Sequence, residues 1–272
     1  MFADRHNSPM QLGGKVALVT GAASGLGAAI SRELSARGAV VYLADVDFQK
    51  AQLTAGEIGG TPVHLDISNA SQVETAIRKM AMELGVLDII VNNAGIICPS
   101  DGLLSFAPEY WRKILSVNLS GTMTASLAAY SVMRDQGFGH IVNIASLSGL
   151  IPVPFLGPYT TSKTALTGFT LGLAAEAEID GVHVSLVCPG NLDTGMAKPS
   201  SVLPSVNVAV AAQRIVKGIS RNERIIVFPL YARAMWWMER VNPGFIRVWN
   251  REIVRRHAKR EAERSVSMPP AA

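Results

Sequence analysis

Short apolar segments alternate with helix-like patterns along most of the chain. Seven segments are mainly apolar at successive positions, which is typical of strands buried on both faces. They cover residues 16–20, 40–44, 63–65, 87–91, 141–145, 182–187 and 225–228. The patterns between them favour helices. One of these helices opens at a Ser71 capping box and places Val73, Ile77 and Met80 on one face.

This alternation predicts a parallel sheet with helices on both of its faces. Because crossovers between parallel strands are right-handed, the sheet is expected to be doubly wound. The chain has 272 residues and shows no repeat or linker before about residue 230. We therefore expect one α/β domain over residues 1–230, followed by an aromatic and basic helical tail over residues 231–272.

Composition narrows the class of protein. Apolar residues make up 49% of the chain and charged residues 17%, which excludes a disordered chain. No apolar run approaches the roughly 18 residues that a membrane-spanning helix needs. Cys98 and Cys188 lie far apart without a CxxC motif, and the five histidines lack paired-ligand spacing, so no disulfide framework or metal site is expected. The first residues lack an export pattern, so a cytoplasmic location is expected.

The net charge of +4 is concentrated in the tail. Between Arg247 and Arg264 there are seven Arg or Lys residues and three Glu, whereas the rest of the chain holds 18 basic and 18 acidic side chains. A neutral body carries no basic face for nucleic acid, so no nucleic-acid partner is expected.

The first predicted strand turns into the first predicted helix at a glycine-rich segment, residues 20–27, with the spacing GxxxGxG. Glycines permit a tight turn and a close approach of the backbone to a pyrophosphate, which the N-terminus of the following helix attracts. An ordinary tight turn is the alternative interpretation. The expected cofactor contacts are Gly21, Ser24, Gly25, Leu26 and Gly27.

Asp45 ends the second predicted strand, 18 residues after Gly27. Its carboxylate can accept hydrogen bonds from both ribose hydroxyls of NAD, and it would repel the 2′-phosphate of NADP. No Lys or Arg in the glycine-rich segment or directly after Asp45 offers a phosphate clamp. NAD is therefore preferred over NADP; the alternative is that Asp45 is an ordinary turn residue at the end of a strand.

Tyr159 and Lys163 are four residues apart, so a helix would place the phenol and the amine on one face. Ser146 lies 13 residues before Tyr159, after the fifth predicted strand, and Ser148 is an alternative hydroxyl. Asn118 lies in a predicted helix between the fourth and fifth strands. A phenol and an amine at this spacing are weak evidence of catalysis when taken alone.

Taken together, the motifs resemble those of the classical short-chain dehydrogenases/reductases. They are residues 20–27, Asn92-Asn93-Ala94-Gly95, Asn118, Ser146, Tyr159 with Lys163, and Pro189-Gly190. The resemblance includes their order and spacing and covers roughly residues 12–230. It implies a Rossmann fold with a seven-stranded parallel sheet, and an NAD-dependent oxidoreductase that interconverts a secondary alcohol and a ketone by hydride transfer.

The resemblance also implies a role for each catalytic residue. Tyr159 would be the general acid/base, and Ser146 would hydrogen-bond the same substrate oxygen. Lys163 would bind the nicotinamide ribose and lower the pKa of the Tyr159 phenol, and Asn118 would hold a water of a proton relay. Further implied cofactor contacts are Asp66, Ile67, Asn93, Ala94, Gly95, Pro189, Gly190, Leu192 and Thr194. Leu192 departs from the PGxVxT pattern of the family.

Residues 147–158 form an apolar, proline-containing approach to Tyr159. Val153, Phe155 and Leu156, together with Met196, would line an apolar cleft. The small-molecule substrate is therefore expected to be lipophilic: steroid-, terpene- or aryl-like. A 3-oxoacyl-thioester reductase and a non-catalytic NAD-binding regulatory or scaffold protein are the alternatives.

The tail contains an amphipathic basic helix. Apolar Phe245, Trp249 and Ile253 recur at helical spacing, with Arg247, Arg251 and Arg255 on another face. Four interpretations stay open for it: packing on its own domain, a lid over the substrate, a subunit contact, and peripheral contact with a membrane. The family resemblance implies a homodimer or homotetramer built through the helices around Asn118 and Tyr159.

Overall fold

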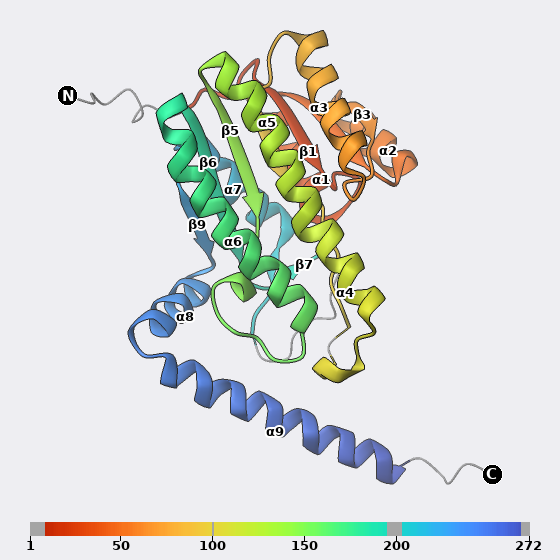
Figure 1. Ribbon diagram of the computed structural model, residues 1–272, viewed down its shortest axis with the longest axis vertical. Helices are drawn as coiled ribbons and strands as arrows, with labels where there is room; N and C mark the ends of the chain where they lie inside the picture. Colours follow the sequence, from red (N-terminus) through yellow and green to blue (C-terminus); the bar gives the residue numbers. More distant parts are fainter. Residues whose placement is uncertain (1–8, 100, 195–202, 268–272) are drawn as a thin grey trace.

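The computed structural model describes residues 9–99, 101–194 and 203–267, with side chains through residue 258. Its centre is a parallel sheet of seven strands in the order β3-β2-β1-β4-β5-β6-β9 (Figure 1). The strands are β1 Val16–Thr20, β2 Val40–Asp45, β3 Thr61–His64, β4 Ile89–Asn92, β5 Gly139–Ile144, β6 Val182–Pro189 and β9 Ile225–Phe228. The order reverses between β1 and β4, which is the topological switch point of a doubly wound fold. The predicted fold is confirmed.

Helices cover both faces of the sheet. They are α1 Gly25–Ala36, α2 Phe48–Ile58, α3 Ala70–Leu84, α4 Pro108–Leu115, α5 Thr122–Gln136, α6 Gly157–Ala177, α7 Val208–Ser220, α8 Leu230–Val241 and α9 Pro243–Ser267. The first core cluster joins α1 and α7 to one face, and the second joins α3, α5 and α6 to the other. Each strand therefore buries apolar side chains in two directions, which is why the strands are apolar at successive positions.

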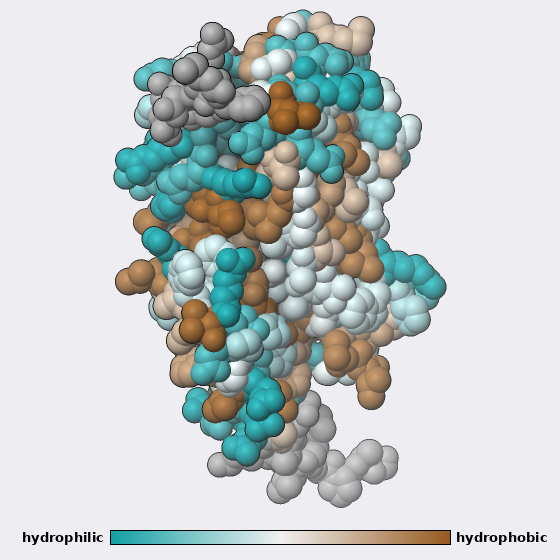
Figure 2. All heavy atoms as spheres, turned by 60° about the vertical axis from the view of Figure 1, so that its left-hand side comes forward, coloured by the Kyte–Doolittle hydropathy of each residue, from teal (hydrophilic) through white to brown (hydrophobic). Residues whose placement is uncertain are grey.

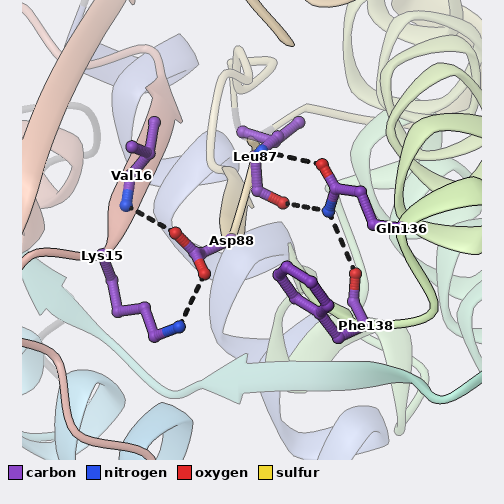
Figure 3. A network of polar contacts seen from close by, with 6 residues as sticks. All are labelled: Lys15, Val16, Leu87, Asp88, Gln136 and Phe138. Carbon is purple, nitrogen blue, oxygen red and sulfur yellow. Dashed lines mark hydrogen bonds and ion pairs between the residues drawn. The ribbon is translucent and has the colours of Figure 1, made fainter. Parts of the chain in front are cut away.

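The amino-terminal edge of the sheet is held by a polar network that lies away from the glycine-rich segment (Figure 3). Lys15 Nζ lies 2.7 Å from Asp88 Oδ1, and the backbone N–H of Val16 donates to Asp88 Oδ2 at 2.9 Å. The Gln136 side chain donates to the carbonyl of Leu87 and accepts from its N–H. These contacts fix the starts of β1, β4 and β5, and leave the opposite edge for the site.

Three local features differ from the sequence prediction. Helix α3 begins at Ala70, because the side chain of Asn69, not that of Ser71, accepts the hydrogen bond from Gln72 N. Strand β3 ends at His64, two residues before Asp66. A second, two-stranded sheet pairs β7 Leu192–Asp193 with β8 Val206–Asn207.

The last two helices form an arm below the sheet in the view of Figure 1, on the side toward which the strands point. Helix α8 follows the edge strand β9, and α9 runs along the side of the molecule where the loop between β5 and α6 lies. The arm is attached through a third core cluster that includes Ala232, Met235 and Ile246. Within the described residues, no helix combines the length and apolar character needed to cross a membrane.

Candidate active site

The glycine-rich segment joins the end of β1 to the start of α1. Gly21 has a φ of 65°, a left-handed conformation that favours glycine. A Cβ on Gly27 would lie 2.1 Å from the carbonyl oxygen of Gly21, so only glycine fits where the helix approaches the turn. Ser24 and Gly25 lie at the start of α1, where free N–H groups and the helix dipole favour an anion.

Thr20 and Asn93 lock the segment to the end of β4. Thr20 Oγ1 accepts hydrogen bonds from the N–H groups of Asn93 and Ala94, both at 3.1 Å. Asn93 Nδ2 in turn donates to the carbonyls of Thr20 and Gly21. Sequence reasoning missed this bridging role of the Thr20 hydroxyl, although it placed Thr20 at the end of the first predicted strand. The neighbouring Asn92 bonds Asn143 of β5 and Ser126 of α5, and so ties the sheet together.

The Asp45 carboxylate lies against the glycine-rich segment. Asp45 Oδ2 accepts from Ala23 N and Oδ1 accepts from Asp47 N, both at 2.9 Å. Sequence reasoning missed a cation nearby: Lys50 Nζ pairs with Asp47 Oδ2 at 2.7 Å. The Asp47 carboxylate, and to a smaller extent that of Asp45, raises the pKa of Lys50. Asp45 thus lies where the sequence predicted it, at the end of β2 and beside the glycine-rich segment. Its carboxylate also holds the backbone of that segment and of the turn after β2.

Asp66 and Ile67 follow β3 at the same edge of the sheet. Hydrogen bonds from the Ser68 hydroxyl and N–H lower the pKa of the Asp66 carboxyl and orient it. The side chain of Ile67 is buried, and a Cβ on Gly121 would lie 2.3 Å from the Ile67 carbonyl oxygen. This close packing joins the predicted adenine side of the site to the segment that carries Asn118.

Ser146 and Tyr159 meet at the end of β5. Ser146 directly precedes a short 3₁₀ turn, Leu147–Gly149, and Tyr159 lies in the first turn of α6. The Ser146 side chain lies close enough to the Tyr159 hydroxyl to lower the pKa of that phenol. Ser148 Oγ donates to Ser146 Oγ at 2.9 Å, so Ser148 supports the predicted hydroxyl and does not replace it at Tyr159.

Lys163 lies beneath this pair. Its side chain is 4% exposed, its Nζ donates to the Ile144 carbonyl at 2.8 Å, and it lies 5.8 Å from the centroid of the Tyr159 ring. A Cβ on Gly95 would lie 3.6 Å from Lys163 Nζ and 3.3 Å from Asn118 Oδ1. The absence of a side chain at Gly95 therefore leaves space between the lysine and the asparagine.

Asn118 lies in a π-helical segment, Ser116–Gly121, between α4 and α5. Its side chain accepts from Ile96 N and donates to Ile96 O, both at 2.8 Å. It also donates to Ser162 Oγ, which donates in turn to the carbonyl of Tyr159. Such π segments are often found at functional sites. The amide thus couples the loop after β4 to α6, through a serine that sequence reasoning did not single out.

The loop after β6 closes the site on the other side. Pro189 ends β6, and Thr194 lies against Gly25, whose added Cβ would be 3.6 Å from the threonine Cβ. Tyr231 of α8 accepts a hydrogen bond at its hydroxyl from Asn191 N at 2.9 Å. A Cβ on Gly190 would lie 2.4 Å from that hydroxyl oxygen. The arm therefore supports the loop that carries Gly190 and Leu192, while Met196 lies outside the described residues.

Burial dominates the titration of the central pair. It raises the pKa of the Tyr159 phenol above its usual value, and the hydrogen bond with Ser146 opposes that rise. Burial also lowers the pKa of Lys163 to about 8. The expected lowering of the tyrosine pKa is thus outweighed by desolvation, which favours the neutral form of both groups.

The two cysteines flank this centre as thiols. Cys98 is 4% exposed and Cys188 is fully buried. Burial raises the pKa of Cys98, and it raises that of Cys188 to about 12. A thiol with a raised pKa is a poor nucleophile, so both cysteines pack as small apolar residues.

A cavity of about 640 Å³ lies away from this centre, beneath the arm. It is lined by Pro152 from the loop before α6, by Glu239 of α8, and by Arg247 and Arg251 of α9. None of the predicted catalytic residues lines it. The carboxyl edge of the sheet is therefore where the predicted cofactor and catalytic residues meet.

Comparison with known proteins agrees with this architecture. A family model described as short chain dehydrogenase matches residues 15–202. Human 17-beta-hydroxysteroid dehydrogenase 13 is 32% identical over 240 residues, which cover 85% of this chain and 80% of the human protein. The 3-oxoacyl-acyl-carrier-protein reductase of Escherichia coli is 34% identical over 194 residues, which cover 71% of this chain and 79% of the reductase.

A solved structure shows the same fold. A short chain dehydrogenase/reductase from Burkholderia phymatum, in complex with NAD, superposes with a TM-score of 0.79 at 25% identity. The superposition covers 87% of this chain and 96% of that protein. The chain belongs to the short chain dehydrogenase family and is an oxidoreductase that acts on CH–OH donors with a nicotinamide cofactor.

Proposed function

We propose that this protein is an NAD-dependent dehydrogenase that interconverts a lipophilic secondary alcohol and its ketone. The observation that carries the proposal is the juxtaposition of Ser146, Tyr159 and buried Lys163 at the edge of the sheet that also carries the glycine-rich turn. Buried titratable groups in such a position are the expected mark of acid–base chemistry.

The glycine-rich edge fits a dinucleotide. Glycines at 21, 25 and 27 permit a tight turn that a pyrophosphate can approach, and a Cβ on Gly27 would collide with the Gly21 carbonyl of that turn. Asp45 and Asp66 would hold the adenosine side, while Lys163, Gly190 and Thr194 would hold the nicotinamide side. A nicotinamide held by these residues would supply the hydride chemistry, as acceptor from the alcohol carbon or donor to the ketone carbon.

The side chains move the proton. In the oxidative direction the alcohol O–H proton passes to the Tyr159 phenolate as the C–H hydride leaves the same carbinol carbon, and a ketone results. Ser146 hydrogen-bonds the substrate oxygen, with Ser148 orienting its hydroxyl. A Lys163 ammonium would favour the phenolate form of Tyr159, as a nearby positive charge does for any acid, and would oppose the desolvation that raises the pKa of the phenol. Asn118 acts as a positioning residue, because its amide is bonded to Ile96 and Ser162.

NAD is the proposed cofactor because of Asp45. The carboxylate lies at the glycine-rich turn, where it would accept ribose hydroxyls and repel a 2′-phosphate. Lys50 is the cation that could oppose this preference, but it is paired with Asp47. The oxidative direction is favoured in a cytoplasm whose NAD pool is oxidised.

A lipophilic substrate is supported by the approach to Tyr159. Val153, Phe155 and Leu156 are partly buried there, and the third core cluster continues the apolar surface toward α8. The relative named 17-beta-hydroxysteroid dehydrogenase 13 supports a steroid-like alcohol. The relative named as a 3-oxoacyl reductase supports the second candidate, reduction of a 3-oxoacyl thioester.

We propose a cytoplasmic homodimer or homotetramer, built through α4, α5 and α6 around Asn118 and Tyr159. The family resemblance supports this assembly. Gel filtration with light scattering tests it, and a monomer would contradict it.

The test of function is a panel of alcohols. NADH formation from NAD⁺ is measured with small polar alcohols, steroids, terpenols and aryl carbinols, and NADP⁺ is run in parallel. We expect turnover of the bulky apolar alcohols with NAD⁺. Turnover of a 3-hydroxyacyl thioester alone would favour the second candidate, and no turnover despite NADH binding would overturn the substrate class.

A further inference from the structure

One side of α9 is largely used inside the molecule, although Phe245, which the sequence assigned to the apolar face, is 54% exposed. Ile246 is fully buried, and Trp249 packs on the third core cluster. Asn250 Nδ2 donates to the carbonyl of Pro152 at 2.9 Å, and the His257 ring stacks on Phe155 at 4.1 Å between centroids. This inner face of α9 holds the loop before α6, so it cannot also contact a partner.

Helix α8 instead leaves an apolar face uncovered. Leu230, Ala234, Trp237 and Val241 recur at helical spacing and form what we call the α8 stripe. Leu230 is 78% exposed, Trp237 57% and Val241 79%. The opposite side of the helix carries the buried Ala232 and Met235, which attach α8 to the domain. The stripe is therefore held outward by packing on the other side.

The exposed apolar surface continues into the start of α9. Phe245 is 54% exposed and Val248 is 63% exposed. Figure 2 brings this side of the molecule forward and shows apolar and hydrophilic atoms interleaved over the lower half, where the arm lies. Several large apolar side chains exposed on one side of a helix mark a candidate contact surface.

The charges around the stripe are almost all positive. Residues 230–258 contain six Arg and two Glu, whereas the rest of the chain has equal numbers of basic and acidic side chains. Arg233 and Arg240 are seven residues apart and so follow one side of the stripe. The guanidinium of Arg240 lies 4.8 Å from the centre of the Trp236 ring. Glu239, the one carboxylate of α8, lies on the other side and lines the cavity beneath the arm.

We propose that the α8 stripe docks the protein on an anionic phospholipid bilayer. Leu230, Trp237 and Val241 would enter the boundary between headgroups and acyl chains, as the apolar face of an interfacial helix does. Arg233 and Arg240 would remain at the lipid phosphates, where basic residues strengthen binding to anionic lipids. The proposed membrane contact lies on α8, whereas the sequence left membrane contact of α9 as one of four open interpretations.

A second copy of the chain fits the stripe less well. A two-fold contact brings the same patch of both subunits together. If the two α8 helices pair antiparallel, the arginines beside the stripe lie on the same side of the contact, and no carboxylate of α8 lies there to neutralise them. An anionic bilayer supplies the opposite charge along the whole stripe.

Vesicle sedimentation of the full-length protein tests the proposal. We expect binding to phosphatidylcholine vesicles that contain phosphatidylserine, and much weaker binding to phosphatidylcholine alone. The double variant W237S/V241S should lose about tenfold or more in partitioning, because it removes the apolar anchors. The double variant R233Q/R240Q should lose the preference for phosphatidylserine.

The matched control changes two apolar side chains of similar exposure elsewhere. Met82 is 83% exposed and Ile179 is 89% exposed, and M82S/I179S should bind vesicles as the original protein does. Equal melting temperatures and turnover of the variants show that the fold is intact.

Unchanged partitioning of W237S/V241S would overturn the proposal, as would absence of vesicle binding. If that variant instead dissociates an oligomer in light scattering, the stripe is a subunit contact. Binding does not depend on turnover, so the proposed function and this proposal can fail separately.

Discussion

At the carboxyl edge of the sheet, polar side chains are buried and bonded to one another, whereas along α8 large apolar side chains point outward. Asn118 and Lys163 are almost fully buried, and both have named hydrogen-bond partners. Trp237 and Val241 lie mostly exposed beside arginines. The first arrangement costs desolvation, and it is the kind of arrangement that the proposed acid–base chemistry requires. The second leaves apolar area exposed to water. Either a further surface covers this area, or the protein forgoes the free energy that its burial would provide.

The two regions also differ in how the family model covers them. The matched family region ends at residue 202, before either helix of the arm begins. Yet the two regions touch: Tyr231 holds the backbone of Asn191, and His257 stacks on Phe155 in the loop before Tyr159. The arm therefore has an inner face that supports the site and an outer face on α8 that does not.

Removing the phenol should have the largest effect. In Tyr159→Phe, we expect turnover to fall about a thousandfold, the scale of general acid–base catalysis, because no group remains to exchange the proton. NADH binding, measured by fluorescence, should persist. The control Tyr42→Phe, a tyrosine of β2, should retain activity. Full turnover by Tyr159→Phe would show that the buried centre is not catalytic.

The cost of burying Lys163 should appear in the pH dependence of stability. Its folded pKa of about 8 lies below the ordinary 10.5, so the unfolded chain binds more protons between these values. The free energy of unfolding should therefore gain up to about 3 kcal/mol from this group as pH rises from 8 to 10.5. In denaturant melts, Lys163→Met should lack that rise in the free energy of unfolding. In the activity assay, the same variant should show no turnover. An identical pH slope in both proteins would contradict the buried placement.

The glycine-rich turn should tolerate no side chain at Gly27. The added Cβ would meet the backbone carbonyl of Gly21 at 2.1 Å, so the turn must shift away from the pyrophosphate. We expect Gly27→Ala to weaken NADH binding about a hundredfold, a scale of about 3 kcal/mol. Gly56→Ala is the control, because its Cβ would meet nothing within 4 Å. Unchanged affinity of Gly27→Ala would place the cofactor elsewhere.

The smallest effect should come from the inner face of the arm. In His257→Ala the ring that stacks on Phe155 is lost, and we expect KM for a bulky alcohol to rise about threefold while kcat stays constant. Arg256→Ala is the control, since Arg256 is exposed and pairs only with Glu252 among the ion pairs of the described side chains. Equal KM values in both variants would mean that α9 merely packs on the domain.

The strands and the catalytic motifs could be predicted because their signals are local. Seven apolar segments located the strands, and the spacing of Tyr159 and Lys163 placed both on one turn of α6. Boundaries were harder, because small side chains decide them: Asn69 caps α3 two residues before the expected serine.

Residues brought in by long-range packing could not be predicted. Ser162 and Tyr231 reach the site only through the folding of α6 and α8 against distant loops. Periodicity showed that the tail is amphipathic, but not which face meets the domain. Ile246 is buried while its neighbour Phe245 is half exposed, and the outward stripe belongs to α8. The raised pKa of Tyr159 likewise depends on burial, which a motif does not reveal.

The most direct test of the central claim follows the hydride itself. A steroid secondary alcohol deuterated at its carbinol carbon is incubated with NAD⁺ and the protein, and the NADH is examined by mass spectrometry. The account predicts that the original protein forms NADH carrying one deuterium. It predicts that Tyr159→Phe forms this NADH about a thousandfold more slowly. NADH without deuterium, or no NADH although the cofactor binds, would contradict it.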